Sequence, residues 1–214
     1  MARDAVILLS GGLDSVVLAY DLVRQGRQVR AVHFNIDREA EDYEFNAAKN
    51  TALTLDFPFE AVDLCGMKQM MLGFMDVDGW RGEADIVCPD VSAVPSLVAM
   101  GMYYAQLAGI GELYLATIRE QTAGRPSLPQ FFDALSDTSR LFDPKYTEVR
   151  ICNPYLTKSK AEVIELGQRL GVPFERTWSC HFALAAHCGK CPGCQARTQG
   201  FTSARVADPT RYLA

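Results

Sequence analysis

The sequence has no apolar stretch long enough to cross a membrane, and its basic residues are scattered, with no run of lysine or arginine longer than two. With a net charge of −5, this scatter argues against a broad electrostatic contact with nucleic acid. No internal repeat or low-complexity segment interrupts the 214 residues, and 49% of them are hydrophobic, so we expect one domain over residues 1–214. The first apolar residues favour a strand over a signal peptide, and we expect a cytoplasmic protein.

Apolar segments with strand and helix periodicity alternate along the chain, which predicts an α/β fold with a doubly wound parallel sheet. Strands are expected over 6–9, 29–34, 59–62, 112–118 and 150–153, and helices over 15–24, 42–55, 96–108, 130–141 and 159–170. The helix at 96–108 is apolar nearly all round, so we expect it to be buried, and residues 123–129 read as a loop. Ser159 and Glu162 form a capping-box pattern, and Gly171 is typical of a helix end.

The most informative segment follows the first predicted strand and reads Ser10-Gly11-Gly12-Leu13-Asp14-Ser15. Two glycines permit a sharp turn, and the helix that follows directs its unpaired N–H groups and positive dipole end at that turn. No Gly-Lys-Ser/Thr follows at the spacing of a Walker loop. The segment therefore predicts an anion site of another type, and a plain strand-turn-helix corner with incidental glycines is the alternative.

Four cysteines near the end of the chain are separated by seven, two and two residues: Cys180, Cys188, Cys191 and Cys194. Disulfides are not expected in a cytoplasmic chain, whereas four thiolates suit a closed, structural Zn²⁺ site, which defines a zinc-knuckle subregion over 178–200. An iron–sulfur cluster is the alternative, and His181 and His187 could substitute as ligands. The remaining cysteines have no partner by spacing and are interpreted as small apolar side chains: Cys65, Cys88 and Cys152.

The hexapeptide resembles the pyrophosphate loop (PP-loop) of the N-type ATP pyrophosphatases. Residues 159–164 and 171–180, followed by the last three cysteines of the cluster, resemble the end of the QueC family, the 7-cyano-7-deazaguanine synthases. The resemblance implies an adenine nucleotide alpha hydrolase-like (HUP-type) fold, with ATP, Mg²⁺ and a structural Zn²⁺. It also implies a ligase that adenylates the carboxylate of 7-carboxy-7-deazaguanine, releases pyrophosphate, and couples the acyl group to ammonia to give an amide and then a nitrile.

The resemblance also implies roles for single residues. The phosphates would lie on the whole loop: Ser10, Gly11, Gly12, Leu13, Asp14 and Ser15. Asp14 would order the loop or help to hold Mg²⁺, and Lys160 is a candidate phosphate-facing cation, with a solvated charge as its alternative. Adenine and ribose would lie near the ends of the first two strands, where the candidates are Phe34, Asn35 and Asp37; a turn role is the alternative for the last two. A purine could stack on Trp178, although a core tryptophan is the favoured interpretation.

Three segments depart from the QueC pattern, namely 37–40, 94–98 and 124–131. Loss of an Arg and an Asp removes groups that could read a purine edge, so the acid, the acceptor or the partner is expected to differ. QueC-like paralogues of antiphage operons join the deazapurine acid to a protein amine, which suits this divergence. The expected partners are thus a deazapurine acid, with a protein amine and a second copy in a homodimer left open. A tRNA-thiolating PP-loop enzyme and a catalytically idle module that binds ATP and zinc are the alternatives.

Overall fold

The computed structural model describes residues 4–65, 95–123, 126–141 and 145–213, and its centre is a five-stranded sheet in the order β3-β2-β1-β4-β5. Every pair of neighbouring strands is parallel. The strands are β1 (Asp4–Leu8), β2 (Gln28–Asn35), β3 (Phe59–Asp63), β4 (Glu112–Tyr114) and β5 (Arg150–Cys152). The chain builds outward from β1 on one side and then returns to its other side, so the predicted doubly wound sheet is confirmed, with its switch point between β1 and β4.

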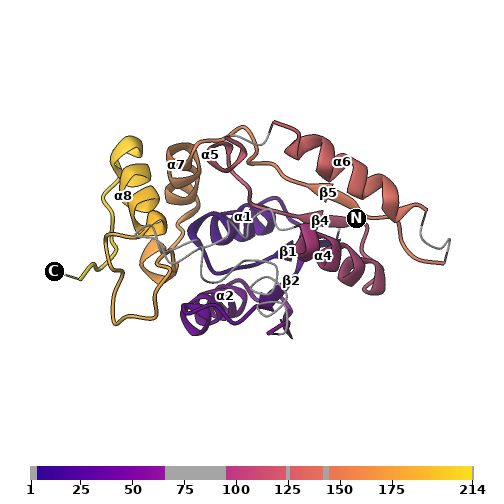
Figure 1. Ribbon diagram of the computed structural model, residues 1–214, viewed down its shortest axis with the longest axis horizontal. Helices are drawn as coiled ribbons and strands as arrows, with labels where there is room; N and C mark the ends of the chain where they lie inside the picture. Colours follow the sequence, from indigo (N-terminus) through magenta and orange to yellow (C-terminus); the bar gives the residue numbers. More distant parts are fainter. Residues whose placement is uncertain (1–3, 66–94, 124–125, 142–144, 214) are drawn as a thin grey trace, which may run out of the picture.

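Helices cover both faces of this sheet (Figure 1). They are α1 (Leu13–Arg24), α2 (Glu41–Leu55), α4 (Pro95–Leu107), α5 (Arg119–Thr122), α6 (Leu128–Ser139), α7 (Lys160–Leu170) and α8 (Pro192–Ala204), with a 3-10 turn, η2 (Phe174–Arg176). Side chains alternate along β1, so Ala5 and Ile7 join the core under α1 and α7, whereas Val6 joins the core under α4 and α6. None of the helices in the described ranges is long and apolar enough for a membrane span.

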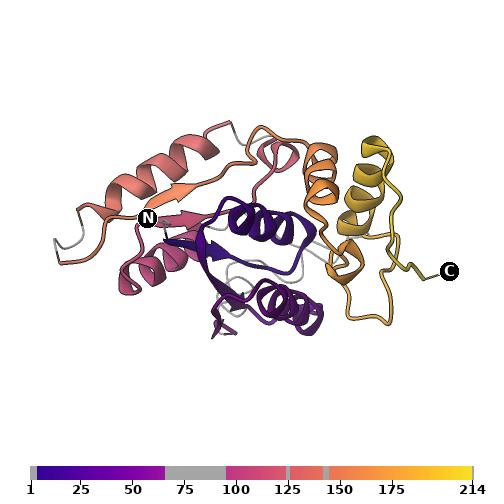
Figure 2. The ribbon, with the colours of Figure 1, turned by 180° about the vertical axis from the view of Figure 1, so that it is seen from behind.

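At the C-terminal end of the molecule, α7 packs between α1 and α8, and the chain ends beside α8, as Figure 2 shows from behind. The start of α7 is fixed by the predicted capping box: Ser159 Oγ accepts from Glu162 N, and the Glu162 carboxylate accepts from Ser159 N at 2.7 Å. Gly171 ends the helix in the left-handed conformation, at φ 72°. Lys160 is therefore the first residue of α7, and its side chain packs on α8, where a Cβ at Gly200 would lie 2.3 Å from Lys160 Cγ.

The expectation that the helix at 96–108 is buried holds for one side of it only. Val98 and Ala105 are buried against the sheet, whereas Met100, Tyr103 and Leu107 are 37%, 47% and 60% exposed. A helix that lies on a sheet covers it with one side only, so an apolar composition on every side does not by itself bury the other.

Two element boundaries that matter for the cavity differ from the prediction, and one helix was not predicted. β4 ends at Tyr114 rather than at residue 118 because β5 offers only three residues to pair with it. Residues 115–117 then leave the ladder and line a cavity. α6 begins at Leu128 rather than 130, since Pro129 is tolerated in a first turn. Helix α8 was not predicted, and it begins within the cysteine cluster.

Candidate active site and metal centre

The backbone of the loop between β1 and α1 makes a turn that needs glycine at its first bend. Gly11 has φ 80°, and a Cβ there would lie 2.1 Å from Glu44 O of α2, so a larger residue would strain the turn and collide with the next helix. Gly12 is the N-cap of α1 and offers no side chain to the first-turn N–H groups. These N–H groups are left for a ligand, as the predicted anion site requires.

Two hydroxyl groups and one neighbouring segment hold the loop in place. Ser15 Oγ donates to Gly12 O at 2.9 Å, and the Ser10 and Ser15 hydroxyls are 3.1 Å apart. From a distant part of the chain, Trp178 N donates to Gly11 O at 3.0 Å. The loop is thus formed before any ligand arrives, which lowers the conformational cost of binding.

A cavity of about 420 Å³ opens beside this loop at the carboxyl ends of β1, β2 and β4. Its polar and loop lining is Ser10, Gly12, Leu13, Asp14, Ser15, His33, Arg38, Glu41, Glu44, Thr117, Gln121, Lys160, Ser179 and His181. This is the position at which ligands bind in doubly wound sheets. The structure therefore brings five of the six loop residues and Lys160 to one cavity, while Gly11 faces α2.

Lys160 and Asp14 meet at this cavity although 146 residues separate them. Lys160 Nζ donates to Asp14 Oδ2 at 2.6 Å, and the two side chains are only 18% and 14% exposed. Within the described part of the chain, Asp14 Oδ1 is buried and has no hydrogen-bond partner. An ammonium group next to helix N–H groups fits a phosphate, and a buried carboxylate oxygen without a partner fits a divalent cation such as Mg²⁺.

The three residues expected near the ribose are placed differently from one another. Phe34 lines the cavity, whereas Asn35 and Asp37 are not among the lining residues. Asn35 Oδ1 accepts from Asp37 N at 2.8 Å, and Asp37 is exposed, with φ 59°. This is the geometry of a side-chain-stabilised turn, the alternative that the sequence left open for both residues.

The polar groups on the wall of the cavity formed by β2 and α2 were not predicted from the sequence. His33 is buried; its Nδ1 lies 2.9 Å from Leu9 O and its Nε2 lies 2.6 Å from Glu41 Oε1. Arg38 donates to Glu44 Oε2 at 3.2 Å. Burial raises the pKa of Glu44 to about 7, with Arg38 opposing the rise and Glu41 adding to it. The signals available in the sequence were the departure from the QueC pattern at 37–40 and the acidic residues three positions apart on one helix face.

Trp178 is held between two protein rings. Its ring stacks on Tyr43 with centroids 4.2 Å apart, and His187 lies 4.4 Å from it. His187 Nε2 accepts from Ser179 N at 3.1 Å, so that nitrogen serves the backbone. This packing supports the structural interpretation of Trp178 over stacking with a purine.

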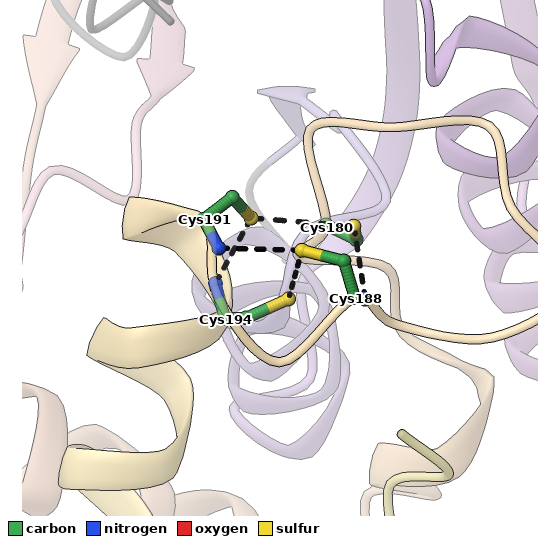
Figure 3. A group of neighbouring side chains, drawn as sticks. All are labelled: Cys180, Cys188, Cys191 and Cys194. Atoms are coloured by element: carbon green, nitrogen blue, oxygen red, sulfur yellow. Dashed lines mark hydrogen bonds between the residues drawn. The ribbon is translucent and has the colours of Figure 1, made fainter. Parts of the chain in front are cut away.

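The four clustered cysteines meet at the start of α8, and their sulfur atoms all lie within 4.8 Å of one another (Figure 3). Lys190 N and Cys191 N donate to Cys188 Sγ at 3.4 and 3.2 Å, and Cys194 N donates to Cys191 Sγ at 3.4 Å. Burial opposes ionisation of Cys188, but the donated N–H bonds lower its pKa to about 7. Four convergent sulfurs stabilised by N–H donors fit a tetrahedral metal with no open position, as structural Zn²⁺ sites require.

The other cysteines lie away from this centre. Cys65 lies just after β3 and is exposed, so it does not pack as the small apolar side chain that was expected. Cys152 packs at the edge of the core, as expected, and Cys88 lies outside the described residues.

A buried arginine braces the cysteine cluster, and nothing in its sequence context indicated it. Arg197 of α8 is 1% exposed, and its guanidinium donates to Phe174 O and Thr177 Oγ1 at 2.7 Å each and to Thr210 Oγ1 at 2.6 Å. Asp208 Oδ1 lies 3.8 Å from Arg197 Nε. The arginine thereby ties α8 to the segment before the cysteines and to the C-terminal tail.

Comparisons with known proteins show the family and the fold of the chain. The family model described as "Queuosine biosynthesis protein QueC" matches residues 4–205. A 7-cyano-7-deazaguanine synthase of Methanoregula boonei is 32% identical, with 97% of this chain and 98% of the relative covered. One of Halobacterium salinarum is also 32% identical, with 99% and 96% covered. The solved structure of NMN synthetase from Francisella tularensis has a TM-score of 0.56 at 18% identity, covers 97% of this chain and 79% of its own, and supports the fold alone.

Proposed function

Because this chain belongs to the QueC family, we propose that it is an ATP-dependent ligase that adenylates the carboxylate of 7-carboxy-7-deazaguanine and couples the acyl group to a nitrogen nucleophile. The names of the relatives support the substrate class. The observation that carries the proposal is the contact of 2.6 Å between Lys160 and Asp14 beside the loop, within a cavity of about 420 Å³.

Different residues of the cavity would have different roles in the adenylation step. The N–H groups at the start of α1 and the hydroxyls of Ser10 and Ser15 would hold the departing pyrophosphate, and Lys160 would compensate its charge. Asp14 would keep Lys160 in place through Oδ2 and present Oδ1 to Mg²⁺. When bound, Mg²⁺ supplies charge neutralisation on the pyrophosphate. The cysteine cluster would hold Zn²⁺ in a structural role, since it offers no open position.

The proposed nitrogen nucleophile is ammonia or the amine of a protein. Support for an altered acceptor comes from residues 37–40, which depart from the QueC pattern and place Arg38 at the cavity, next to Glu41 and Glu44 of α2. An amine in neutral water is an ammonium ion, and carboxylates in a partly buried wall attract such a cation. The transfer of an acyl group to a protein amine, as in antiphage paralogues, is the finer form of this proposal.

Mass spectrometry of a reaction with ATP, Mg²⁺ and 7-carboxy-7-deazaguanine tests the proposal, run with and without ammonium. Appearance of AMP with the amide or nitrile supports the deazaguanine synthase reaction. AMP or adenylate without either product supports the same acid with another acceptor, and a mass increase on a co-expressed protein then identifies a protein amine. Absence of ATP cleavage with this acid contradicts the proposal.

A further inference from the structure

Glu44 occupies a defined place next to the loop. Its backbone oxygen packs on the bend of the loop, since a Cβ at Gly11 would lie 2.1 Å from Glu44 O. Its side chain is 12% exposed and lines the cavity that Lys160 and Ser10 also line. The backbone of Glu44 thus lies next to the loop, and its side chain lines the cavity and is partly shielded from water.

The second half of the proposed reaction needs a proton acceptor. The attacking nitrogen forms the C–N bond to the acyl carbon, the bond from that carbon to the AMP oxygen breaks, and AMP leaves as an anion. The nitrogen must lose a proton in this step, and a positioned carboxylate with a pKa near the working pH accepts it well. The proposed function assigns the loop and Lys160 to the phosphates, so the base must come from another residue of the cavity.

We propose that Glu44 is the general base that removes the proton from the nitrogen nucleophile. The inference rests on the proposed adenylation and names the residue that completes it. The proton passes from the attacking nitrogen to the Glu44 carboxylate and from there to solvent through the cavity.

The carboxylates at the cavity each have one oxygen in a hydrogen bond, but their partners differ. Asp14 Oδ2 accepts from Lys160 at 2.6 Å, and the proposed function assigns its Oδ1 to Mg²⁺. Glu41 Oε1 lies 2.6 Å from Nε2 of the buried His33. Glu44 accepts one bond, from Arg38 to Oε2, and no hydrogen bond among the described residues engages its Oε1. A carboxylate with one oxygen held and the other available can both keep its position and take a proton.

The charges around Glu44 suit this exchange at neutral pH. The groups that face it are Arg38 from the loop before α2, Glu41 from its own helix and His33 from β2. Burial raises its pKa to about 7, so near pH 7 both the carboxylate and its protonated form are well populated. An exposed glutamate, in contrast, would be a weak base at this pH.

The test separates the two half-reactions of the full-length protein by using two nucleophiles. We compare the unaltered protein, Glu44→Gln and the matched control Glu39→Gln, whose residue is exposed and lies outside the cavity lining. Exchange of pyrophosphate into ATP that requires 7-carboxy-7-deazaguanine reports adenylation. The amide formed from ammonium reports attack that needs a base, and the hydroxamate formed from hydroxylamine reports attack that needs little base. Hydroxylamine is largely unprotonated at neutral pH and is the stronger nucleophile.

For Glu44→Gln we expect unchanged exchange, a fall in amide formation of about 100-fold or more, and nearly unchanged hydroxamate formation. An equal loss with both nucleophiles would assign Glu44 a structural role and overturn the proposal, and so would unchanged amide formation. Absence of exchange in the unaltered protein overturns the proposed adenylation itself, and with it the role of Glu44.

A second variant, Arg38→Gln, tests the role of Glu44 as a base if Glu44→Gln does not fold. Removal of the positive charge in Arg38→Gln raises the pKa of Glu44 further, because Arg38 favours its charged form. We then compare the rate of amide formation in the variant with that in the unaltered protein at the same ammonium concentration. At pH values below 8 the variant should be slower than the unaltered protein, and above pH 8 the difference should disappear. The corresponding ratio of hydroxamate formation should not change with pH. A flat amide ratio across this range overturns the proposal.

Discussion

The loop at Ser10–Ser15 and the cysteine cluster at Cys180–Cys194 are both compact motifs, yet their polar groups are satisfied in opposite ways. In the cluster, the backbone N–H groups of Lys190, Cys191 and Cys194 donate to sulfurs of the same motif. In the loop, Asp14 Oδ1 has no partner among the described residues, and no side chain caps the start of α1. The cluster is a closed support, whereas the loop keeps groups free for a ligand.

Residues next to the two regions nevertheless link them in two places. Trp178 N donates to Gly11 O at 3.0 Å, which joins the segment before the cysteines to the bend of the loop. Gly200 of α8 lets Lys160 pack closely, because a Cβ there would lie 2.3 Å from Lys160 Cγ. The cysteine cluster starts α8, α8 packs against Lys160, and Lys160 pairs with Asp14 of the loop. The cysteine cluster therefore helps to position the Lys160 ammonium group beside the loop.

The largest expected effect is the loss of zinc and of stability when the cysteine cluster is altered. Cys191→Ser removes one of four ligands, and since structural zinc sites contribute on the order of 10 kcal/mol, we expect zinc loss and a melting temperature lower by about 10 °C or more. Zinc content by atomic emission and thermal unfolding measure both effects. Cys65→Ser is the matched control, because that cysteine is exposed and apart from the cluster. Full stability of the metal-free protein, or a visible absorption band with bound iron, would contradict a structural zinc site.

The second largest effect is expected for Lys160 at the loop, where a substitution should affect activity more than stability. Lys160→Met keeps the stem that packs on Gly200 but removes the charge, so we expect pyrophosphate exchange to fall by about 100- to 1,000-fold. Because Asp14 then loses its partner, the melting temperature should also fall, but by less than in Cys191→Ser. Lys158→Met is the control, since Lys158 lies two residues earlier and does not line the cavity. Exchange that survives in Lys160→Met would leave Lys160 as a structural partner of Asp14 only.

A smaller effect tests the link between the regions. Gly200→Ala places a methyl group against Lys160 and Ile164, whose Cδ1 would lie 2.9 Å away, so Lys160 must shift. We expect exchange to fall by about 10-fold, with a stability loss of roughly 1 kcal/mol, although Gly→Ala in an open helix position is stabilising. Gln199→Ala, at an exposed neighbouring position of α8, is the control. An unchanged exchange rate would show that α8 supports the fold without positioning the charge.

Local motifs account for what the sequence predicted well. The QueC-family resemblance and the fold are confirmed. Ser159, Glu162 and Gly171 set the ends of α7 through contacts within a few residues. The four cysteines lie within residues 180–194, so their spacing was enough to predict that their sulfurs meet. The loop formed with its predicted turn because two glycines and two hydroxyls lie inside six residues. The zinc identity, the single domain over 1–214 and the ligand roles of the loop stay predictions.

What the sequence missed depends on contacts between distant segments. Arg197 contacts residues about 20 positions earlier and 13 positions later, and no periodicity signals a buried guanidinium. The pairing of Lys160 with Asp14 crosses 146 residues, so the sequence offered two candidates but not their contact. The raised pKa of Glu44 follows from burial in the assembled wall, which composition cannot reveal.

The smallest expected effect concerns the cap that sets the position of Lys160. Ser159→Ala removes the hydroxyl that accepts from Glu162 N, so we expect a stability loss of about 1 kcal/mol. Because Lys160 also packs on Gly200 and pairs with Asp14, the first turn of α7 keeps two anchors, and exchange should change by less than in Gly200→Ala. Denaturant unfolding and pyrophosphate exchange on the same preparation measure both quantities. A loss of exchange equal to that of Lys160→Met would mean that the cap, rather than α8, fixes the lysine at the loop.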